Sequence, residues 1–545
     1  MADDKVFTPT KEDAIEVPTL AQNGTTALEA RDNEKPQQGL GKVASIFACG
    51  AALFSDGYVN AITGPVGSIL KRLYKDENPD RFTHFKKLFS SLGFAGTVLG
   101  MLVWGVLSDR VGRKSGMIFA SIWLALFSVL SAGAWGAGGS VDGLFACRTY
   151  FSAVYAIRLG LTRLLTFILI TVIAYRFIQG IAIGAEYPAG SVACSENTEA
   201  PGVNKKRQQM YFSLATNTMI DWGFVVAYFV PLLLIWIFGM NHLTLVWRLS
   251  LGLGAIPPLT LLYFRTKMEE PIHYRKSSIK FSQMPWWLIV KRYWVRLAAI
   301  SIAWFVYDFV SYPAGGYADY IVGQVLPADA SFQANLGWGV VINLFYIPGT
   351  LIGVLVNDRL GPKNTMIVGL LLQAVIGFGL SAGYSGLKNH IAGFAILYGL
   401  FLSAGEFGAG NNLGLLASKA AGPTAVRGTF YGIAAAIGKI GAFVGTYVYT
   451  PISNSLAHGD ESADIYTTGP FYIGSGLAVV SALVIYFGVP NIGEDSMLKE
   501  DEEFRRYLEA NGYDTSLMGT ENFSTPSLES PAASVGPALE EEKHL

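Results

Sequence analysis

The chain has 545 residues, of which 51% are apolar and 15% are charged, and its formal net charge is −1. Soluble domains carry about 25% charged residues, so this composition is typical of a polytopic α-helical membrane protein. Nothing indicates the clustered basic surface that nucleic-acid binding needs, so no nucleic-acid partner is expected. The three cysteines (Cys49, Cys147 and Cys194) lack metal-ligand spacing, and we expect buried thiols rather than a metal site or a disulfide.

Residues 1–41 are polar and acidic without an apolar core, so we expect a disordered tail and no cleavable signal peptide. Apolar segments of about 20 residues follow, the length that crosses a bilayer as a helix. These twelve predicted spans fall near 43–68, 88–107, 115–136, 172–194, 211–236, 246–264, 294–324, 336–356, 365–384, 391–417, 428–451 and 469–489. A polar tail, 491–545, ends the chain.

Lysine and arginine gather in alternate loops, and this bias predicts the orientation of the spans. The loops after even-numbered spans hold many of these cations, whereas the loops after odd-numbered spans hold almost none. We therefore predict that both termini are cytoplasmic. The loop 71–87 is the exception, because it is basic although the bias assigns it to the outer side.

Residues 148–173, between the third and fourth spans, do not fit this alternation of apolar spans and short loops. The segment is long enough to cross a membrane, but Arg158 and Arg163 make it a poor membrane helix. Counting it as a span would also invert every later loop against the charge bias. We interpret it as an insertion, with the hypothesis that it is a translated intron. The sequence of the mature transcript tests that hypothesis.

A ten-residue loop occurs twice in the chain, six spans apart. Residues 105–114 read GVLSDRVGRK and residues 354–363 read VLVNDRLGPK. The duplication predicts two homologous six-helix halves, 42–264 and 294–490, joined by a linker at 265–293. The loops are expected to gate the protein through Gly105, Asp109, Arg110, Gly112, Arg113, Asp358 and Arg359.

Polar and charged side chains lie inside the predicted spans, where a charge is costly unless it faces a cavity, a partner or a proton. Trp304, Asp308 and Tyr312 recur every fourth residue, which places them on one face of a helix. We expect them to share one central site with Asp56, Glu186, Tyr187, Asp221, Asn411, Asn412 and Lys439. The alternative for each acid is an interfacial helix end, or half of a buried ion pair with Lys439 or Arg176.

The chemistry of this set favours a proton-coupled carrier of an anion. Carboxylates without enough nearby cations exchange protons near neutral pH, and a protonated acid can share a cavity with an anion. Tyrosine hydroxyls, asparagine amides, the Trp304 N–H and Lys439 can donate to phosphate oxygens. Composition alone does not choose phosphate over a carboxylate.

The duplicated loop resembles the signature loop of the major facilitator superfamily. Residues 176–184 look like its fourth-helix pattern, and Pro423 with Arg427 and Gly428 looks like its tenth-to-eleventh loop. The resemblance covers residues 42–490 apart from the insertion. It implies an all-α polytopic membrane protein with twelve transmembrane helices in two pseudo-symmetric halves, which rock around a central site.

The Gly-Ala-Glu-Tyr-Pro run at 184–188, together with the intramembrane acids, looks like the proton-phosphate symporter branch, and most like fungal glycerophosphoinositol and glycerophosphocholine permeases. The substrate-binding residues that we predict are Tyr187, Asp221, Trp304, Asp308, Tyr312, Asn411 and Lys439. The proton-coupling residues that we predict are Asp56, Glu186 and Asp308. Plain phosphate symporters usually carry Asp in place of Glu186 and Gln in place of Asp221. The extra acid at Asp221 disfavours bare phosphate and could accept hydrogen bonds from glycerol or inositol hydroxyls.

The leading interpretation is a monomeric proton symporter of the plasma membrane that imports glycerophosphodiesters. The alternatives are an inorganic phosphate symporter, a carrier of another organic anion or of a sugar, and a nutrient sensor that no longer transports. No cofactor is expected, because the proton gradient supplies the driving force. An enzyme is not expected either, because the spans show no Ser/His/Asp grouping and no metal-ligand cluster.

Overall fold

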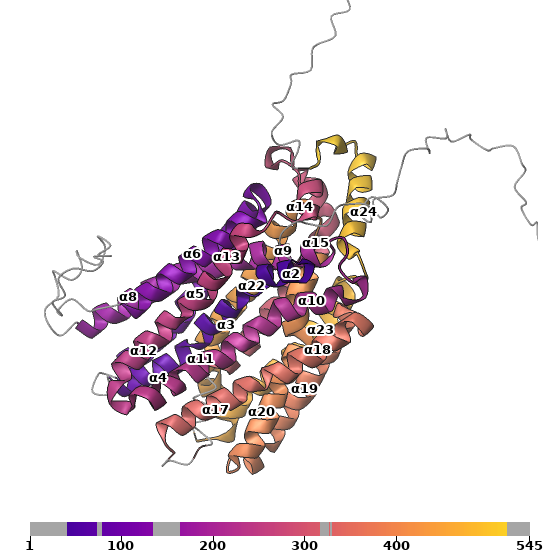
Figure 1. The fold of residues 1–545 in the computed structure, drawn as a ribbon. Coiled ribbons are helices and arrows are strands. Elements are labelled where there is room, and N and C mark those ends of the chain that lie inside the picture. Colours follow the sequence, from indigo (N-terminus) through magenta and orange to yellow (C-terminus); the bar gives the residue numbers. More distant parts are fainter. Residues whose placement is uncertain are drawn as a thin grey trace, which may run out of the picture.

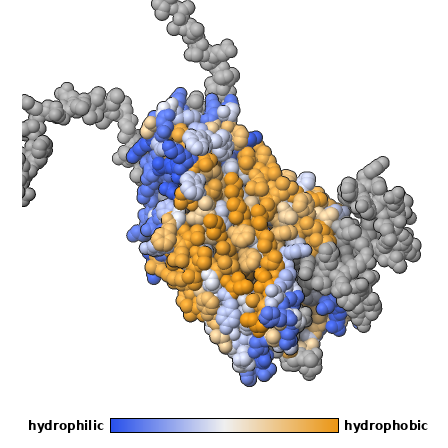
Figure 2. Space-filling view, turned by 180° about the vertical axis from the view of Figure 1, so that it is seen from behind, coloured by the Kyte–Doolittle hydropathy of each residue, from blue (hydrophilic) through white to orange (hydrophobic). Residues whose placement is uncertain are grey.

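The computed structural model describes residues 41–73, 79–133, 164–316, 326, 330–460 and 462–519, and every regular element within them is helical (Figure 1). The long helices run side by side in one elongated bundle. Figure 2 shows a broad belt of apolar side chains on the bundle, with hydrophilic residues toward both ends. Such a belt matches the hydrocarbon layer of a bilayer, in which helices satisfy their own backbone hydrogen bonds.

The helices divide into two halves in chain order. The N-terminal half contains α2 (Lys42–Gly50), α3 (Leu53–Ala61), α4 (Thr63–Leu73), α5 (Pro79–Val111), α6 (Arg113–Ala132), α8 (Leu164–Glu186), η1 (Tyr187–Ser191), α9 (Val192–Thr198), α10 (Gln208–Ala215), α11 (Asn217–Phe238), α12 (Leu243–Gly252) and α13 (Ile256–Lys267). The C-terminal half contains α15 (Trp286–Gly316), α17 (Phe332–Leu344), α18 (Tyr346–Leu360), α19 (Pro362–Leu387), α20 (Ile391–Gly405), η6 (Glu406–Gly410), α21 (Asn411–Lys419), η7 (Thr424–Val426), α22 (Arg427–Leu456) and α23 (Asp464–Gly488).

Eleven helical segments of the described chain are long and apolar enough to cross a membrane. The remaining predicted span, near 172–194, lies in the continuous run of α8, η1 and α9. The prediction of an all-α, polytopic membrane fold is confirmed.

Two boundaries differ from the sequence-based expectation. Residues 164–173, assigned to an insertion, form the first turns of α8, whereas residues 148–163 lie outside the described chain. The insertion and its origin as an intron therefore stay a prediction. The linker between the two halves is also shorter than the predicted 265–293, because α13 runs to Lys267 and α15 begins at Trp286.

The two halves meet along helices that glycine allows to come close together. A Cβ atom on Gly432 of α22 would lie 2.4 Å from the backbone oxygen of Met101 on α5, so only glycine fits at that crossing. On the other side of the interface, α11 of the N-terminal half packs against α17 of the C-terminal half. Small residues at such crossings let membrane helices pack backbone to backbone.

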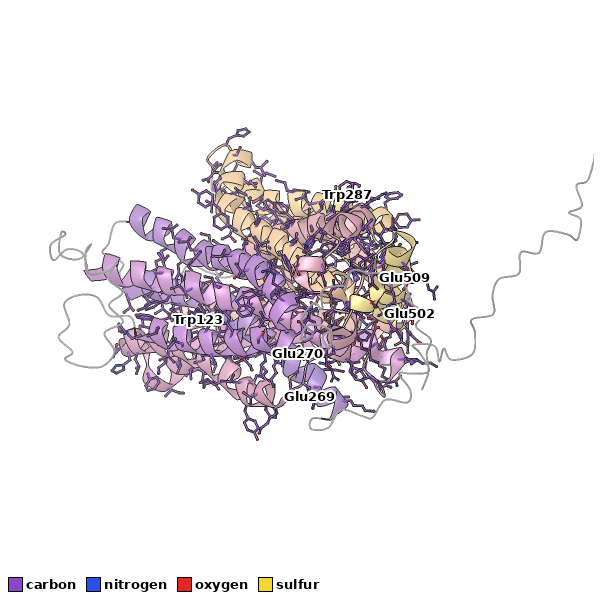
Figure 3. The ribbon with its side chains drawn as sticks, turned by 90° about the horizontal axis from the view of Figure 1, so that it is seen from above. Trp123, Glu269, Glu270, Trp287, Glu502 and Glu509 are labelled. Atoms are coloured by element: carbon purple, nitrogen blue, oxygen red, sulfur yellow. The ribbon has the colours of Figure 1, made fainter. Side chains whose placement is uncertain are left out.

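One end of the bundle carries extra helices, and we name it the tail end. It comprises α14 (Ile272–Ser277) of the linker, α24 (Ser496–Ala510) of the C-terminal tail, and the helix starts at Gln208 and Thr424 (Figure 1). Seen from above, Glu502 and Glu509 of α24 lie toward the same side as Trp287 at the start of α15 (Figure 3). Part of the predicted polar tail is thus an ordered helix, with Met497, Phe504 and Leu508 buried.

Candidate functional site

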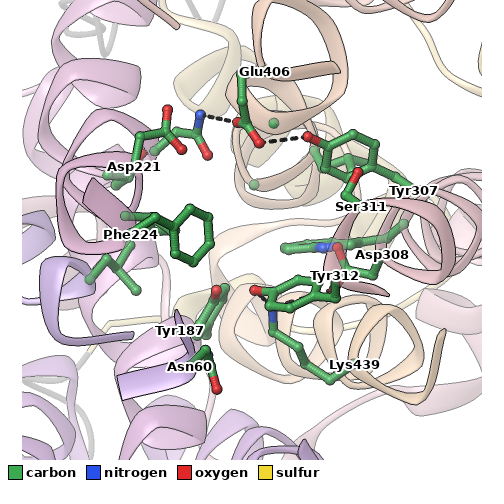
Figure 4. Close-up of a pocket in the computed structure, with 18 of the residues that line it drawn as sticks. Asn60, Tyr187, Asp221, Phe224, Tyr307, Asp308, Ser311, Tyr312, Glu406 and Lys439 are labelled. Carbon is green, nitrogen blue, oxygen red and sulfur yellow. Dashed lines mark hydrogen bonds and ion pairs between the residues drawn. The ribbon is translucent and has the colours of Figure 1, made fainter. Parts of the chain in front are cut away.

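A cavity lies between the two halves, and side chains from both halves line it (Figure 4). The predicted substrate-binding residues all contribute to its lining: Tyr187, Asp221, Trp304, Asp308, Tyr312, Asn411 and Lys439. The structure thus brings together residues that are up to 252 positions apart in the chain. Of the predicted proton-coupling residues, Asp308 lines the cavity, whereas Asp56 and Glu186 are buried outside the lining.

Two wide helical turns shape the cavity wall, one from each half. The π-helical turns η1 and η6 occupy equivalent places in the fourth and tenth spans. Pro188 in η1 and the glycines of η6 favour this departure from α-helical geometry. Each turn presents a polar side chain to the cavity, Tyr187 from η1 and Glu406 from η6.

Lys439 of α22 forms a cationic pole on one side of the cavity. Its ammonium nitrogen lies 3.3 Å from Asp308 Oδ2 and donates a hydrogen bond to the Tyr312 hydroxyl. The same nitrogen lies 4.0 Å from the centre of the Tyr312 ring and 5.2 Å from that of Tyr187. Asp308 Oδ2 itself accepts no hydrogen bond. The ion pair is therefore loose, and an incoming anion can compete with Asp308 for Lys439.

Asp56 lies directly behind Tyr187. Its two carboxylate oxygens accept hydrogen bonds from the Tyr187 hydroxyl at 2.5 Å and from the Asn60 amide at 2.6 Å. Tyr187 thus connects this buried acid to the cavity. Arg176, the alternative ion-pair partner, donates to the backbone oxygen of Val59 at 2.5 Å and lies over the Phe89 ring.

The opposite side of the cavity is acidic (Figure 4). Glu406 accepts hydrogen bonds from the Asn217 amide at 2.8 Å and from the Tyr307 hydroxyl at 2.7 Å. Asp221 Oδ2 accepts a hydrogen bond from the Thr350 hydroxyl, whereas Asp221 Oδ1 is buried without a donor. None of the ion pairs in the described chain includes Asp221 or Glu406.

Asparagine side chains join the two acids through a chain of hydrogen bonds. The Asn411 amide donates to the backbone oxygen of Thr350 at 2.9 Å, and its oxygen accepts from Asn217 at 3.4 Å. Asn217 and Asp221 come from the N-terminal half, whereas Asn411, Thr350 and Glu406 come from the C-terminal half. Asn412, which we also expected at the site, instead donates to the backbone oxygen of Gly408 in the adjoining η6 at 2.7 Å.

Glu186 lies in a buried ion pair away from the cavity. Arg265 holds it with two guanidinium nitrogens, and the Nη1–Oε2 distance is 2.7 Å. The same guanidinium donates to the backbone oxygens of Cys49 and Met117, each at 2.9 Å. From the sequence we expected Lys439 or Arg176 as the partner of Glu186, and we placed Arg265 in the linker. Arg265 is instead fully buried in α13. A role for Glu186 in the proton path stays a prediction.

The first copy of the duplicated loop ties the two halves together at the tail end. Asp109 accepts hydrogen bonds from the backbone N–H groups of Gly428 at 3.0 Å and Thr429 at 2.6 Å. The carboxylate thus caps the start of α22, where the helix dipole favours negative charge. Asp109 also pairs with Arg113 at 2.5 Å, and Arg113 contacts Glu196 of α9 at 3.3 Å.

The second copy of the loop repeats this arrangement in the other direction. Asp358 accepts hydrogen bonds from the backbone N–H groups of Gln209 at 3.2 Å and Met210 at 3.3 Å, at the start of α10. Each half therefore caps a helix of the other half with the acid of its own loop. This reciprocity is the structural counterpart of the sequence repeat.

The other predicted loop residues have different roles. Gly112 has φ +106°, and a Cβ atom there would lie 2.3 Å from Glu270 Oε1, so glycine is required. Gly105 lies against the backbone of Gly428. A Cβ atom on Gly105 would lie 3.0 Å from the Gly428 backbone oxygen, which is closer than ordinary van der Waals contact. Arg110 and Arg359 are exposed, and Arg110 stacks on the Phe281 ring of the linker.

Helix α24 reinforces the same end. Asp501 accepts hydrogen bonds from the Thr424 backbone N–H at 2.7 Å and the Thr424 hydroxyl at 2.5 Å, and it lies 3.6 Å from Arg427. Burial raises the pKa of Asp501, but Arg427 and His273 outweigh it, so the net pKa lies below its ordinary value. The Met497 backbone N–H donates to Glu199, which follows the end of α9, at 3.1 Å. The tail helix thus contacts both halves.

Several cavity residues were not predicted from the sequence as site residues. They are Asn60, Asn217, Phe224, Tyr307, Tyr346, Thr446 and Glu406. Glu406 carried the clearest signal, because it is an acid inside the apolar tenth span, as Asp308 is in the seventh. Among the described residues, no group of three His, Cys, Asp or Glu side chains could hold a metal ion.

A helical bundle of two pseudo-symmetric halves around a central polar cavity defines a membrane carrier of the major facilitator type. Solved structures agree. The proton:xylose symporter XylE bound to 6-bromo-6-deoxy-D-glucose superimposes with a TM-score of 0.68 and 17% identity, over 85% of this chain and 98% of that one. A bacterial homologue of the iron transporter ferroportin superimposes with a TM-score of 0.55.

The chain belongs to the sugar (and other) transporter family, whose sequence profile matches residues 43–278 and 276–504. It is 46% identical over 480 residues to a glycerophosphocholine permease of Candida albicans, covering 87% of this chain and 83% of the relative. It is 44% identical over 481 residues to the major glycerophosphoinositol permease of the same organism, with the same coverage. An inorganic phosphate transporter of Toxoplasma gondii is 24% identical over 80% of this chain. The chain is therefore a multi-pass membrane transporter.

Proposed function

We propose that the protein is a proton-coupled symporter that imports glycerophosphodiesters by alternating access. The loose ion pair of Lys439 and Asp308 inside the cavity is the observation that supports this most. Lys439 and the Tyr312 hydroxyl beside it can donate to the oxygens of one phosphate group, and Tyr187 can join them when its hydroxyl turns from Asp56 to the cavity. The permeases that share 44–46% identity add support for a phosphodiester rather than another anion.

Proton coupling follows from charge balance in this geometry. When a phosphate oxygen takes the place of Asp308 on Lys439, the carboxylate loses its counter-ion in a buried site. A proton on Asp308 then restores neutrality, because an unpaired charge at this depth is costly. Release of the anion lets Asp308 return to Lys439 and give up the proton. Asp56, linked to the cavity by Tyr187, is placed to exchange protons with the site.

The tail end is the cytoplasmic end in this proposal. The charge bias of the loops supports that orientation, and the plasma membrane is the expected location for an importer of extracellular nutrients. With the tail end held shut by Asp109 and Asp358, the described conformation is closed toward the cytoplasm. Substrate would enter from the opposite end, and the protein would work as a monomer.

Inorganic phosphate is the second candidate, because the Lys439 pole would bind it equally well. The acidic side of the cavity argues against it, since a bare phosphate brings no donor to Asp221 Oδ1 and no cation to Glu406, which has only neutral partners. A larger substrate with a head group beyond the phosphate would reach them.

Uptake of radiolabelled glycerophosphodiester by cells that lack their own permease tests the proposal. We expect uptake that collapses when a protonophore is added and that resists excess inorganic phosphate. Uptake that phosphate abolishes at equal concentration would favour the phosphate carrier instead. Absence of uptake, with the protein present at the cell surface, would contradict transport of this substrate class.

A further inference from the structure

The charged groups of the cavity are segregated into two poles. Figure 4 shows Asp221 and Glu406 on one side, and Lys439 with Tyr187 and Tyr312 on the other. In the proposed function, the cationic pole around Lys439 binds the phosphate group. The acidic pole has no such assignment, although it contains two buried carboxylates from opposite halves of the protein.

The acidic pole is unsatisfied in the described structure. Asp221 is fully buried, and its Oδ1 atom has no hydrogen-bond donor. Glu406 has donors on both oxygens, but these are the neutral groups of Asn217 and Tyr307. Two buried carboxylates with only neutral partners are stabilised by a proton or by a cation. When these acids are charged, they favour positive charge in whatever fills the space beside them.

Aromatic rings complete the wall next to these acids. Phe224 lies between the two poles, with its ring centre 5.4 Å from that of Tyr346 and 6.5 Å from that of Tyr312. Tyr307 bonds to Glu406 and also lines the cavity. Aromatic faces combined with carboxylates form the surroundings in which proteins bind alkylated ammonium groups. A polyol head group would instead need free donors and acceptors, whereas the amides of Asn217 and Asn411 already bond to each other, to Glu406 and to Thr350.

We propose that Asp221, Glu406 and the rings of Phe224 and Tyr346 form a head-group subsite that selects a cationic, ammonium-bearing glycerophosphodiester. This inference rests on the proposed function, because it takes the phosphate to lie at Lys439. The two poles then match the two charges of a zwitterionic substrate such as glycerophosphocholine. Asp221 is the counter-ion of the ammonium, and Glu406 supports it from the other half.

Transport kinetics of two substrates test the subsite. Initial uptake of labelled glycerophosphocholine and glycerophosphoinositol would be measured for the wild type, Asp221→Asn, Glu406→Gln and the charge-retaining Asp221→Glu. We expect Asp221→Asn to lower kcat/KM for glycerophosphocholine by about 10- to 100-fold, because the carboxylate attracts the quaternary ammonium through charge alone and the amide does not. The value for glycerophosphoinositol should change by less than about threefold. Glu406→Gln should act in the same direction, and Asp221→Glu should keep the wild-type preference.

The outcomes separate this inference from the proposed function. Equal losses for both substrates in Asp221→Asn would overturn the subsite, because the acid would then serve coupling or folding. A wild-type preference for glycerophosphoinositol would also overturn it. If the wild type takes up no glycerophosphodiester, the proposed function fails, and a binding titration of the purified protein with glycerophosphocholine decides the subsite alone. Binding that Asp221→Asn weakens supports it, and absence of binding by the wild type contradicts it.

Discussion

The buried acids of the tail end and those of the cavity are stabilised in opposite ways. At the tail end, Asp109 pairs with Arg113 at 2.5 Å and Glu199 pairs with Lys419 at 2.9 Å, and Asp109 also caps a helix. In the cavity, Asp221 and Glu406 have only neutral donors, and Asp308 shares the ammonium of Lys439 with the Tyr312 hydroxyl. The difference teaches that the tail end is built to hold one arrangement, whereas the cavity is built to change partners.

Removing the charge of Asp308 should have the largest effect, because Asp308 and the substrate anion then no longer exchange places on Lys439. Asparagine has the same size but cannot take up and release a proton. We expect Asp308→Asn to abolish proton-driven accumulation, measured as the internal-to-external ratio of labelled substrate under an imposed pH gradient. Asp464→Asn, in a partly exposed pair with Lys388, is the matched control and should accumulate normally. Wild-type accumulation by Asp308→Asn would remove this residue from the coupling mechanism.

Asp109→Asn should loosen the tail end strongly. The substitution breaks a buried ion pair and weakens a helix cap, a loss of about 3 kcal/mol for the closed state. The rate at which Cys194 is alkylated measures this loosening, because its thiol is buried in a cluster that includes Leu415 of the other half. With Cys49 and Cys147 replaced by Ala, we expect Cys194 to be alkylated about 100-fold faster. Arg359→Gln, at an exposed position of the matching loop, is the control, and an unchanged rate in Asp109→Asn would contradict the role given to this acid.

Asp358→Asn should have a smaller effect of the same kind. Asp358 is only partly buried and accepts two longer backbone hydrogen bonds without a paired arginine like Arg113. Its charge is worth about 1 kcal/mol at a helix start, so alkylation of Cys194 should accelerate by about fivefold. Equal acceleration by both variants would show that the two copies of the loop hold the halves equally.

Replacing Asp501 should have the most local effect, one confined to α24. Because its pKa is lowered in the folded protein, its stabilisation is complete above the ordinary carboxyl pKa and is lost as the pH falls through the lowered value. Docking of α24 should therefore not weaken between about pH 8 and pH 5, where Asp501 keeps its charge and protonation of His273 adds to the pairing. Hydrogen exchange of residues 496–510, corrected for intrinsic rates, measures this docking. Asp501→Asn should lower protection there by about tenfold, and a loss of protection in the wild type between pH 8 and 5 would contradict the pairing.

The fold was predictable because membrane-length apolar runs and a duplicated loop leave few alternatives. Helix α24 was missed because its surroundings are charged. Its buried residues Met497, Phe504 and Leu508 nevertheless recur at helical spacing, so the signal was present in the sequence.

The site was predictable where local spacing sufficed and not where pairing was long-range. Trp304, Asp308 and Tyr312 reach the cavity because a single helix sets their common face. The partner of Glu186 could not be inferred, because Arg265 is 79 positions away and lies at the end of an apolar segment. Only tertiary packing decides which buried cation meets which buried acid.

The position of α24 has a consequence for how the protein is made. Residues of α24 leave the ribosome after every membrane span, yet they supply Asp501 to the start of α22 and a backbone donor to Glu199. The nascent chain therefore inserts all its spans before the tail end can complete its closure. A chain that terminates before residue 496 would be inserted but left with Arg427 lacking one of its two acids. In such a chain the start of α22 also loses both hydrogen bonds from Thr424 to Asp501, so the tail end stays incompletely closed.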